Sequence, residues 1–166
     1  MGDINKVICM GVINMAEFNN IYDFLKNDHE TVKGLINETL NKRDTKNFNE
    51  IKTQLEIHMM GEEKYLYPAL REKDKEEMDK SYQEHHVGKL VLHELKKTDK
   101  DDEHWMPKMK VLNDILNQHI DEEENTIFPK ARNMLNSEQE QDILKKLKRS
   151  KSLMEKQPMK KILEVR

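Results

Sequence analysis

The sequence predicts an all-α fold: an up-down-up-down four-helix bundle with an N-terminal arm and a short C-terminal helix. Two observations lead to this prediction: helix breakers are scarce, and apolar residues recur at helical intervals between short polar segments. Charged residues make up 37% of the chain, whereas only five Gly and four Pro occur among 166 residues. Abundant Lys, Glu and Leu favour helix over strand, and no segment alternates with a period of two. We therefore expect no β-sheet.

The first expected helix runs from about Asn19 to Leu40. Its apolar stripe advances in steps of three and four residues, so its members share one helix face. The stripe consists of Tyr22, Leu25, His29, Val32 and Ile36. The polar residues 41–46 that follow are expected to form a turn.

The later helices are expected from their start signals. In three places a polar residue stands three positions before Glu, which is the spacing of a capping box: Asn47 with Glu50, Asp74 with Glu77, and Ser137 with Glu140. Pro107 suits the first turn of the fourth helix. The expected ranges are 47–70, 74–97, 107–134 and 138–148.

The length fits one domain that is large enough to bury a core. Three segments are expected along it. Residues 1–17 form an N-terminal arm, residues 18–135 form the bundle, and residues 136–166 form the C-terminal helix with a basic tail.

Charge and cysteine content argue against several functional classes. The net charge is -3, so we expect no basic face for nucleic acid or an anionic membrane. The longest apolar stretch, Val7 to Ile13, is too short to cross a bilayer and lacks the flanks of a signal peptide. Cys9 is the only cysteine, so an internal disulfide is impossible. We expect a cytoplasmic protein in which Cys9 is an idle thiol.

The chain repeats itself. HMMGEEKYLYP, from His58 to Pro68, corresponds to HIDEEENTIFP, from His119 to Pro129, at an offset of 61 residues. The segment DHE at residues 28–30 likewise resembles EHH at residues 84–86. Two helical hairpins of similar design, related by approximate twofold symmetry, are therefore expected to form the bundle.

The expected turns place four histidines at one level. The midpoints between His29 and His58, His58 and His85, and His85 and His119 fall at 43–44, 71–72 and 102, inside the three expected turns. In an up-down-up-down bundle, residues equally far from a turn lie at the same height, here roughly 20 Å from the turns.

The common height of the four histidines in the bundle predicts a metal site. His58 with Glu62, and His119 with Glu123, are each four residues apart, so each pair shares a helix face. His29 and His85 enter from the other two helices. Four imidazoles and two carboxylates at one depth suit iron or manganese better than structural zinc. Burying them without a metal would be costly.

Other interpretations apply to single residues. A lone His on an apolar stripe is usually a core residue with one hydrogen-bond partner. Acidic residues beside the pairs are expected to be solvated or to support the ligands: Glu30, Glu63, Glu122 and Glu124. Glu124 is also an alternative carboxylate ligand. His86 is expected at the surface or in support of the ligands, and the alternative is that it is itself a ligand. Packing is expected for Tyr65, Tyr67 and Phe128.

These motifs resemble the hemerythrin-like family, also called the HHE cation-binding domain. The resemblance covers residues 19–134 and rests on DHE at 28–30, His-x3-Glu at 58–62, EH at 84–85 and His-x3-Glu at 119–123. It implies two iron ions with a bridging oxo or hydroxo group; manganese or zinc is less favoured. The implied bridging carboxylates are Glu62 and Glu123, and the implied terminal ligands are His29, His58, His85 and His119.

The chain departs from the oxygen-carrying hemerythrins. These have a second His four residues after the first on the third helix, where this chain has Lys89. The fourth-helix motif also ends in Glu at the fourth position rather than Asp at the fifth. One imidazole fewer leaves a coordination position for water or an exogenous ligand, and reversible oxygen transport is not expected. Ferritin-like sites use Glu-x-x-His, which is absent at the matching positions.

Two functions are carried forward. The first is binding or sensing of O2, NO or a similar small ligand at a di-iron centre, with a partner protein or a homodimer to receive the signal. The second is a di-iron enzyme or iron-handling protein, which would reduce peroxide or nitric oxide or oxidise and store iron. A bundle with a vestigial site is a third interpretation.

Overall fold

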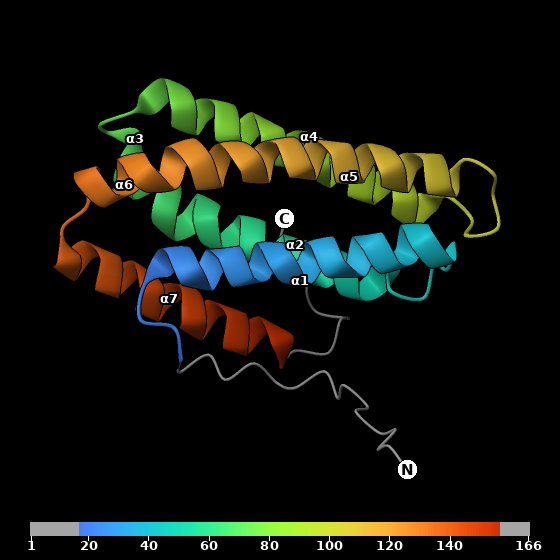
Figure 1. The fold of residues 1–166 in the computed structure, drawn as a ribbon, viewed down its shortest axis with the longest axis horizontal. Coiled ribbons are helices and arrows are strands. Elements are labelled where there is room, and N and C mark those ends of the chain that lie inside the picture. Colours follow the sequence, from blue (N-terminus) through green and yellow to red (C-terminus); the bar gives the residue numbers. More distant parts are fainter. Residues whose placement is uncertain (1–16, 157–166) are drawn as a thin grey trace, which may run out of the picture.

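The computed structural model describes residues 17–156, and within them it contains helices and no strand. Four long helical segments run antiparallel to their neighbours in the chain and form the expected bundle (Figure 1). The second and fourth segments are each interrupted by a π-helical turn, η2 or η3. In chain order the elements are α1 (Ile21–Lys42), α2 (Phe48–Gly61), η2 (Glu62–Leu66), α3 (Tyr67–Arg71), α4 (Lys75–Lys97), α5 (Trp105–Glu122), η3 (Glu123–Ile127), α6 (Phe128–Met134) and α7 (Ser137–Glu155).

Of the capping residues predicted at the starts of helices, some are confirmed and some are wrong. Asp74 accepts a hydrogen bond from the backbone N–H of Glu77 at the start of α4, as predicted. The capping box predicted at Asn47 is wrong, because its side chain makes no capping hydrogen bond at the start of α2. The amide of Asn47 instead donates to Glu38, which ties the α1–α2 turn to α1.

Helix α7 differs from its prediction at both ends. Asn136 caps it and forms a capping box with Gln139, so the predicted pair of Ser137 and Glu140 is wrong by one residue. The helix also continues beyond its expected end to Glu155, because the basic sequence there contains no Gly or Pro to stop it. The N-terminal arm, with Cys9, lies outside the described residues except for its last residue, as does the last part of the basic tail.

The two π-helical turns are features that the sequence analysis did not predict. In η2 the N–H of Tyr67 donates to the carbonyl of Glu62, and in η3 the N–H of Phe128 donates to the carbonyl of Glu123. Pro68 and Pro129 stand two residues after the ends of η2 and η3, and proline has no N–H to continue a regular ladder. The extra residue in each turn shifts the helix register. Tyr67 and Phe128, five positions after Glu62 and Glu123, can therefore lie on the same helix face as those glutamates.

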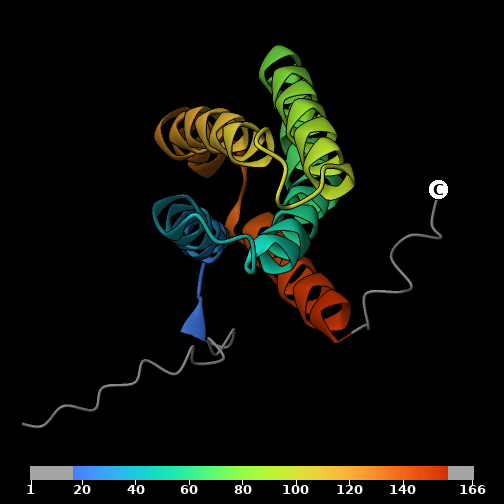
Figure 2. The same ribbon diagram turned by 90° about the vertical axis from the view of Figure 1, so that its right-hand side faces the viewer.

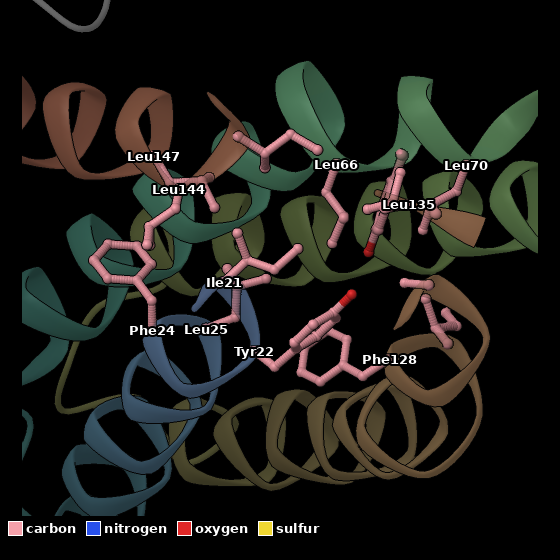
Figure 3. Packing of buried hydrophobic residues seen from close by; sticks show 14 of the residues in the cluster. Ile21, Tyr22, Phe24, Leu25, Leu66, Leu70, Phe128, Leu135, Leu144 and Leu147 are labelled. Atoms are coloured by element: carbon pink, nitrogen blue, oxygen red, sulfur yellow. The ribbon is translucent and has the colours of Figure 1, made fainter. Parts of the chain in front are cut away.

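Buried apolar side chains form two clusters, one toward each end of the bundle. The first joins α7 to the starts of α1 and α4 and to α3 and α6, and it includes Ile21, Tyr22, Leu66, Phe128 and Leu144 (Figure 3). The second lies toward the other end and includes Val32, Ile51, Leu92, Trp105 and Leu112. A layer of polar residues, described below, separates the two clusters.

Helix α7 lies outside the four-helix arrangement, against α1 and α2 (Figure 2). Its residues Ile143, Leu144 and Leu147 are buried, so α7 is part of the core rather than an appendage. None of the helices in the described range is both long and apolar enough to cross a membrane.

Candidate metal centre

The six residues predicted as metal ligands lie together in the layer between the two hydrophobic clusters. They are His29 from α1, His58 from α2, Glu62 from η2, His85 from α4, His119 from α5 and Glu123 from η3. None of them is more than 6% exposed. Helix spacing therefore aims all six side chains inward, as the common level of the histidines predicts.

Their nitrogen and oxygen atoms form two groups, each with all atoms within 4.8 Å of one another. One group consists of His29, His58, Glu62 and Glu123, and the other of Glu62, His85 and His119. The Nε2 atoms of His29 and His58 are 3.1 Å apart, and those of His85 and His119 are 3.0 Å apart. Glu62 spans both groups, because its Oε1 is 3.2 Å from Nε2 of His58 and its Oε2 is 3.3 Å from Nε2 of His85.

The two glutamates fit a cation. Both are fully buried, and within the described part of the chain Oε1 of Glu62 and Oε2 of Glu123 accept no hydrogen bond. That oxygen of Glu123 lies 3.2 Å from Nε2 of His29 and 3.8 Å from Nε2 of His119, so Glu123 also spans the two groups. A buried carboxylate oxygen without a partner is costly, and a metal ion would supply the missing partner.

The two carboxylates differ in acidity. Burial and the neighbouring charge of Glu123 raise the pKa of Glu62 well above its ordinary value of 4.5. Burial also acts on Glu123, but the close imidazole of His29 and the charge of His119 outweigh it and lower the pKa of Glu123. Two neighbouring buried carboxylates do not both ionise readily without a cation, so Glu62 is the one that more readily keeps its proton in metal-free protein. Metal binding would displace that proton.

Every ligand histidine has a carboxylate near its outward nitrogen, Nδ1. The pairs are His29 with Glu124 at 2.7 Å, His119 with Glu84 at 2.7 Å, His85 with Glu63 at 3.0 Å and His58 with Asp28 at 3.5 Å. A carboxylate at Nδ1 holds the proton there and leaves Nε2 free to bind a metal. The two hairpins use equivalent residues for this, so the twofold repeat extends beyond the ligands.

Three of these carboxylates, Asp28, Glu63 and Glu84, have lowered pKa values. Burial raises the pKa of Asp28 and of Glu63, but His58 and His85 respectively outweigh it, and both pKa values lie below the ordinary range. A hydrogen bond from His119 lowers the pKa of Glu84 directly. The three carboxylates therefore act as acceptors at neutral pH.

The structure also places the residues that the sequence left open. Glu124 supports His29 and is not one of the grouped ligand atoms. Glu122 pairs with Lys80 at the surface. The side chains of Glu30 and His86 are exposed, so His86 does not supply a further imidazole.

Comparison with known protein families matches residues 20–131 to the hemerythrin HHE cation-binding domain. The match covers more than half of the chain and includes all six site residues. The chain belongs to this family. The structure and the match together establish a hemerythrin-like cation-binding domain with a cluster of His and Glu that could hold metal.

Two relatives illustrate the similarity. A DNA nickase from Nostoc sp. is 31% identical over 141 residues, which are 80% of this chain and 39% of the nickase. An uncharacterized hemerythrin-like protein from Schizosaccharomyces pombe is 27% identical over 136 residues, 78% of this chain and 64% of the relative. The chain thus spans less than two thirds of the length of either. No solved structure matches it significantly.

Tyr67 breaks the twofold repeat of this hemerythrin-like domain. Its hydroxyl donates to Oε1 of Glu123 at 3.1 Å and lies 3.1 Å from Nε2 of His85. The equivalent residue in the other hairpin is Phe128, whose ring stacks on that of His29. Burial and the two glutamates raise the pKa of Tyr67 well above 10.0, so its hydroxyl remains a donor. Packing, which was expected for both residues, is the role of Phe128. Tyr67 also hydrogen-bonds within the cluster, because η2 turns its hydroxyl inward.

A cavity of about 20 Å³ adjoins the histidines of the hemerythrin-like domain. Besides the four histidines, its lining consists of Asp28, Val32, Leu55, Met59, Glu84, Gly88, Ile115, Leu116 and Ile120, and the exposed lining surface is mostly apolar. Gly88 is buried on α4, one turn after His85, and a Cβ at this position would meet no atom within 4 Å. The missing side chain therefore leaves space beside the cluster of His and Glu.

Lys89 occupies the position of the additional histidine of oxygen carriers. Its ammonium group pairs with Glu63 at 2.5 Å, outside the cluster of ligand atoms. The third helix thus contributes His85 alone to the two groups of ligand atoms.

Proposed function

We propose that the six residues hold two iron ions with a bridging oxo or hydroxo group, and that this centre binds dioxygen, nitric oxide or a similar small ligand. The observation that carries the proposal is the small, mostly apolar cavity lined by all four histidines of the cluster. Bound iron would supply the coordination position and the electrons for such a ligand. The chain would hold the metal, fix the imidazoles and exclude water.

The donor set supports iron. Imidazole nitrogens and bridging carboxylate oxygens in a helical bundle suit a two-metal centre of iron, with manganese second. Structural zinc sites take four ligands and often use thiolate, whereas the donors grouped here are nitrogen and oxygen.

The cavity supports a small uncharged ligand. A water molecule needs about 10–15 Å³ of such space and two or more polar partners. The volume of about 20 Å³ is little more than one water-sized molecule needs, so only a very small ligand fits, and the mostly apolar lining offers water few partners. On another side of the ligand cluster, Tyr67 presents a protonated hydroxyl. A partner protein or a second copy of the chain would then receive the signal.

One observation favours the second candidate, a di-iron enzyme or iron-handling protein. Reduction of peroxide or nitric oxide consumes protons, and the hydroxyl of Tyr67 lies within 3.5 Å of both glutamates and of Nε2 of His85. It is therefore placed to donate a proton to a group held between the glutamates.

The test is ligand binding to iron-loaded protein. Iron would be added without oxygen, and nitric oxide titrated while the absorption and electron paramagnetic resonance spectra are recorded. Saturable binding without ligand consumption supports the binding function. Continuous consumption in proportion to iron content supports the enzyme instead, and the absence of any spectral change would contradict both.

A further inference from the structure

Helix α7, which lies outside the four-helix arrangement, contributes a lysine to the polar layer between the two clusters. The ammonium group of Lys151 donates a hydrogen bond to Oδ1 of Asp28, and the other oxygen of Asp28 faces His58. This ion pair is buried, since the side chains of Lys151 and Asp28 are only 12% and 6% exposed. The ring of Phe24 lies 5.6 Å from the ammonium and favours its position there.

The other three supporting carboxylates also have lysine neighbours, but at the surface. Lys26, Lys80 and Lys89 approach Glu124, Glu84 and Glu63 at 4.0, 3.5 and 2.5 Å. Their side chains are 42–49% exposed, so water screens their charge. Lys151 is the one among these four that acts in a buried environment, where an ionic interaction is stronger.

The contact between Asp28 and His58 is also the loosest of the four. Their atoms are 3.5 Å apart, whereas the other three histidines have a carboxylate at 2.7–3.0 Å. The buried lysine and the loose histidine contact therefore occur at the same carboxylate. Lys151 and His58 face different oxygens of this one carboxylate.

Specific contacts hold α7 in this place. The hydroxyl of Tyr22 donates to Glu140 at 2.5 Å, and Lys148 donates to the carbonyl of Phe18 at 2.6 Å. Leu147 packs so closely on α2 that a Cβ at Gly61 would lie 2.7 Å from its Cδ2. Lys151 is thus presented to Asp28 by a docked helix, and α7 lies beyond residues 20–131 that match the family.

We propose that Lys151 is a positioning residue that draws Asp28 away from His58, weakens the support of that ligand and makes the two metal positions inequivalent. The proposal rests on the metal centre of the proposed function but on no particular gas or substrate. A carboxylate at Nδ1 makes an imidazole a stronger electron donor to a metal. A nearby positive charge also favours the lower oxidation state. Both effects of Lys151 raise the midpoint potential of the iron beside His58.

The first test is the midpoint potential of iron-loaded protein in the Lys151→Met variant, which keeps the apolar stem and removes the charge. We expect a shift to more negative potential, restored by Lys151→Arg. The matched control is Lys80→Met, which removes the exposed lysine of the equivalent carboxylate and should leave the potential unchanged. No shift in Lys151→Met, or an equal shift in Lys80→Met, would overturn the proposal.

A second test needs no metal and is independent of the proposed function. In metal-free protein, the Nδ1 proton of His58 is followed by NMR after isotope labelling. Lys151→Met should move this resonance downfield, because Asp28 is then free to accept a stronger hydrogen bond. The shift should vanish in the Asp28→Asn background, where the acceptor is weakened. An unchanged His58 resonance, with α7 still docked by its backbone signals, would overturn the proposal even if the chain binds no iron.

Discussion

At the scale of single residues, the two buried glutamates carry an electrostatic cost. Glu62 and Glu123 each keep an oxygen without a hydrogen-bond donor within the described range, and burial raises the pKa of Glu62. The protonated form of Glu62 therefore favours the folded state. This contribution is complete below the ordinary pKa of 4.5 and is lost as pH rises through the folded pKa.

The Glu62→Gln variant tests this cost. We expect the metal-free variant to be more stable than the metal-free wild type, by about 1–3 kcal/mol near neutral pH, because the amide cannot ionise. The difference should grow as pH rises above the ordinary pKa of 4.5 toward the raised pKa of Glu62 in the folded protein. Thermal unfolding with a chelator present measures it, with Glu122→Gln as the surface control. A difference that is constant with pH would contradict the assignment.

The second prediction at this scale concerns the hydroxyl of Tyr67. Tyr67→Phe removes the donor of Glu123 Oε1 and should lower the free energy of unfolding of metal-free protein by about 1–3 kcal/mol. Tyr65→Phe is the matched control, because Tyr65 is only partly buried and packs against the first cluster. Equal stability losses in the two variants, measured by denaturant unfolding, would show that Tyr67 acts only through its ring.

At the scale of elements, helix α4 shapes the ligand cavity through Gly88. Gly88→Leu should fill the cavity and weaken nitric oxide or azide binding to the iron-loaded protein by more than about tenfold. Iron content should be unchanged, since Gly88 is not among the grouped ligand residues. Gly34→Leu is the control, because Gly34 is exposed on α1. Undiminished ligand binding in Gly88→Leu would place the ligand elsewhere.

Sequence reasoning predicts these elements unevenly. The stripe of α1 and the four-residue spacing of His58 with Glu62 are local patterns, and both emerge as buried faces. The sequence does not predict the π-helical turns, because the period of a regular α-helix does not reveal where an extra residue is inserted. The extension of α7 was missed because Lys151 resembles a solvated residue until its partner Asp28, 123 positions away, is known.

At the scale of the whole molecule, the polar layer interrupts what would otherwise be a continuous apolar core. The histidines and glutamates lie between two clusters, and the carboxylates at Nδ1 come from neighbouring helices. Four helices are thus tied together through one layer. A metal that binds this layer should stabilise the entire bundle rather than one hairpin.

Metal-dependent stability tests that statement. Metal at about 100 times its dissociation constant should raise the free energy of unfolding by about 2.7 kcal/mol in a single cooperative transition. His85→Ala should lose most of this gain, while the exposed neighbour in His86→Ala should retain it. Calorimetry with and without added iron or manganese measures both. A gain of equal size in His85→Ala would mean that the metal binds outside the layer.

The most direct test of the central claim is metal content, measured together with the absorption spectrum, on protein purified in air and again without oxygen. The account predicts about two irons per chain and charge-transfer bands of an oxo bridge in the near ultraviolet after exposure to air. Zinc alone, or no metal even after anaerobic reconstitution with iron, would contradict a di-iron centre at these residues.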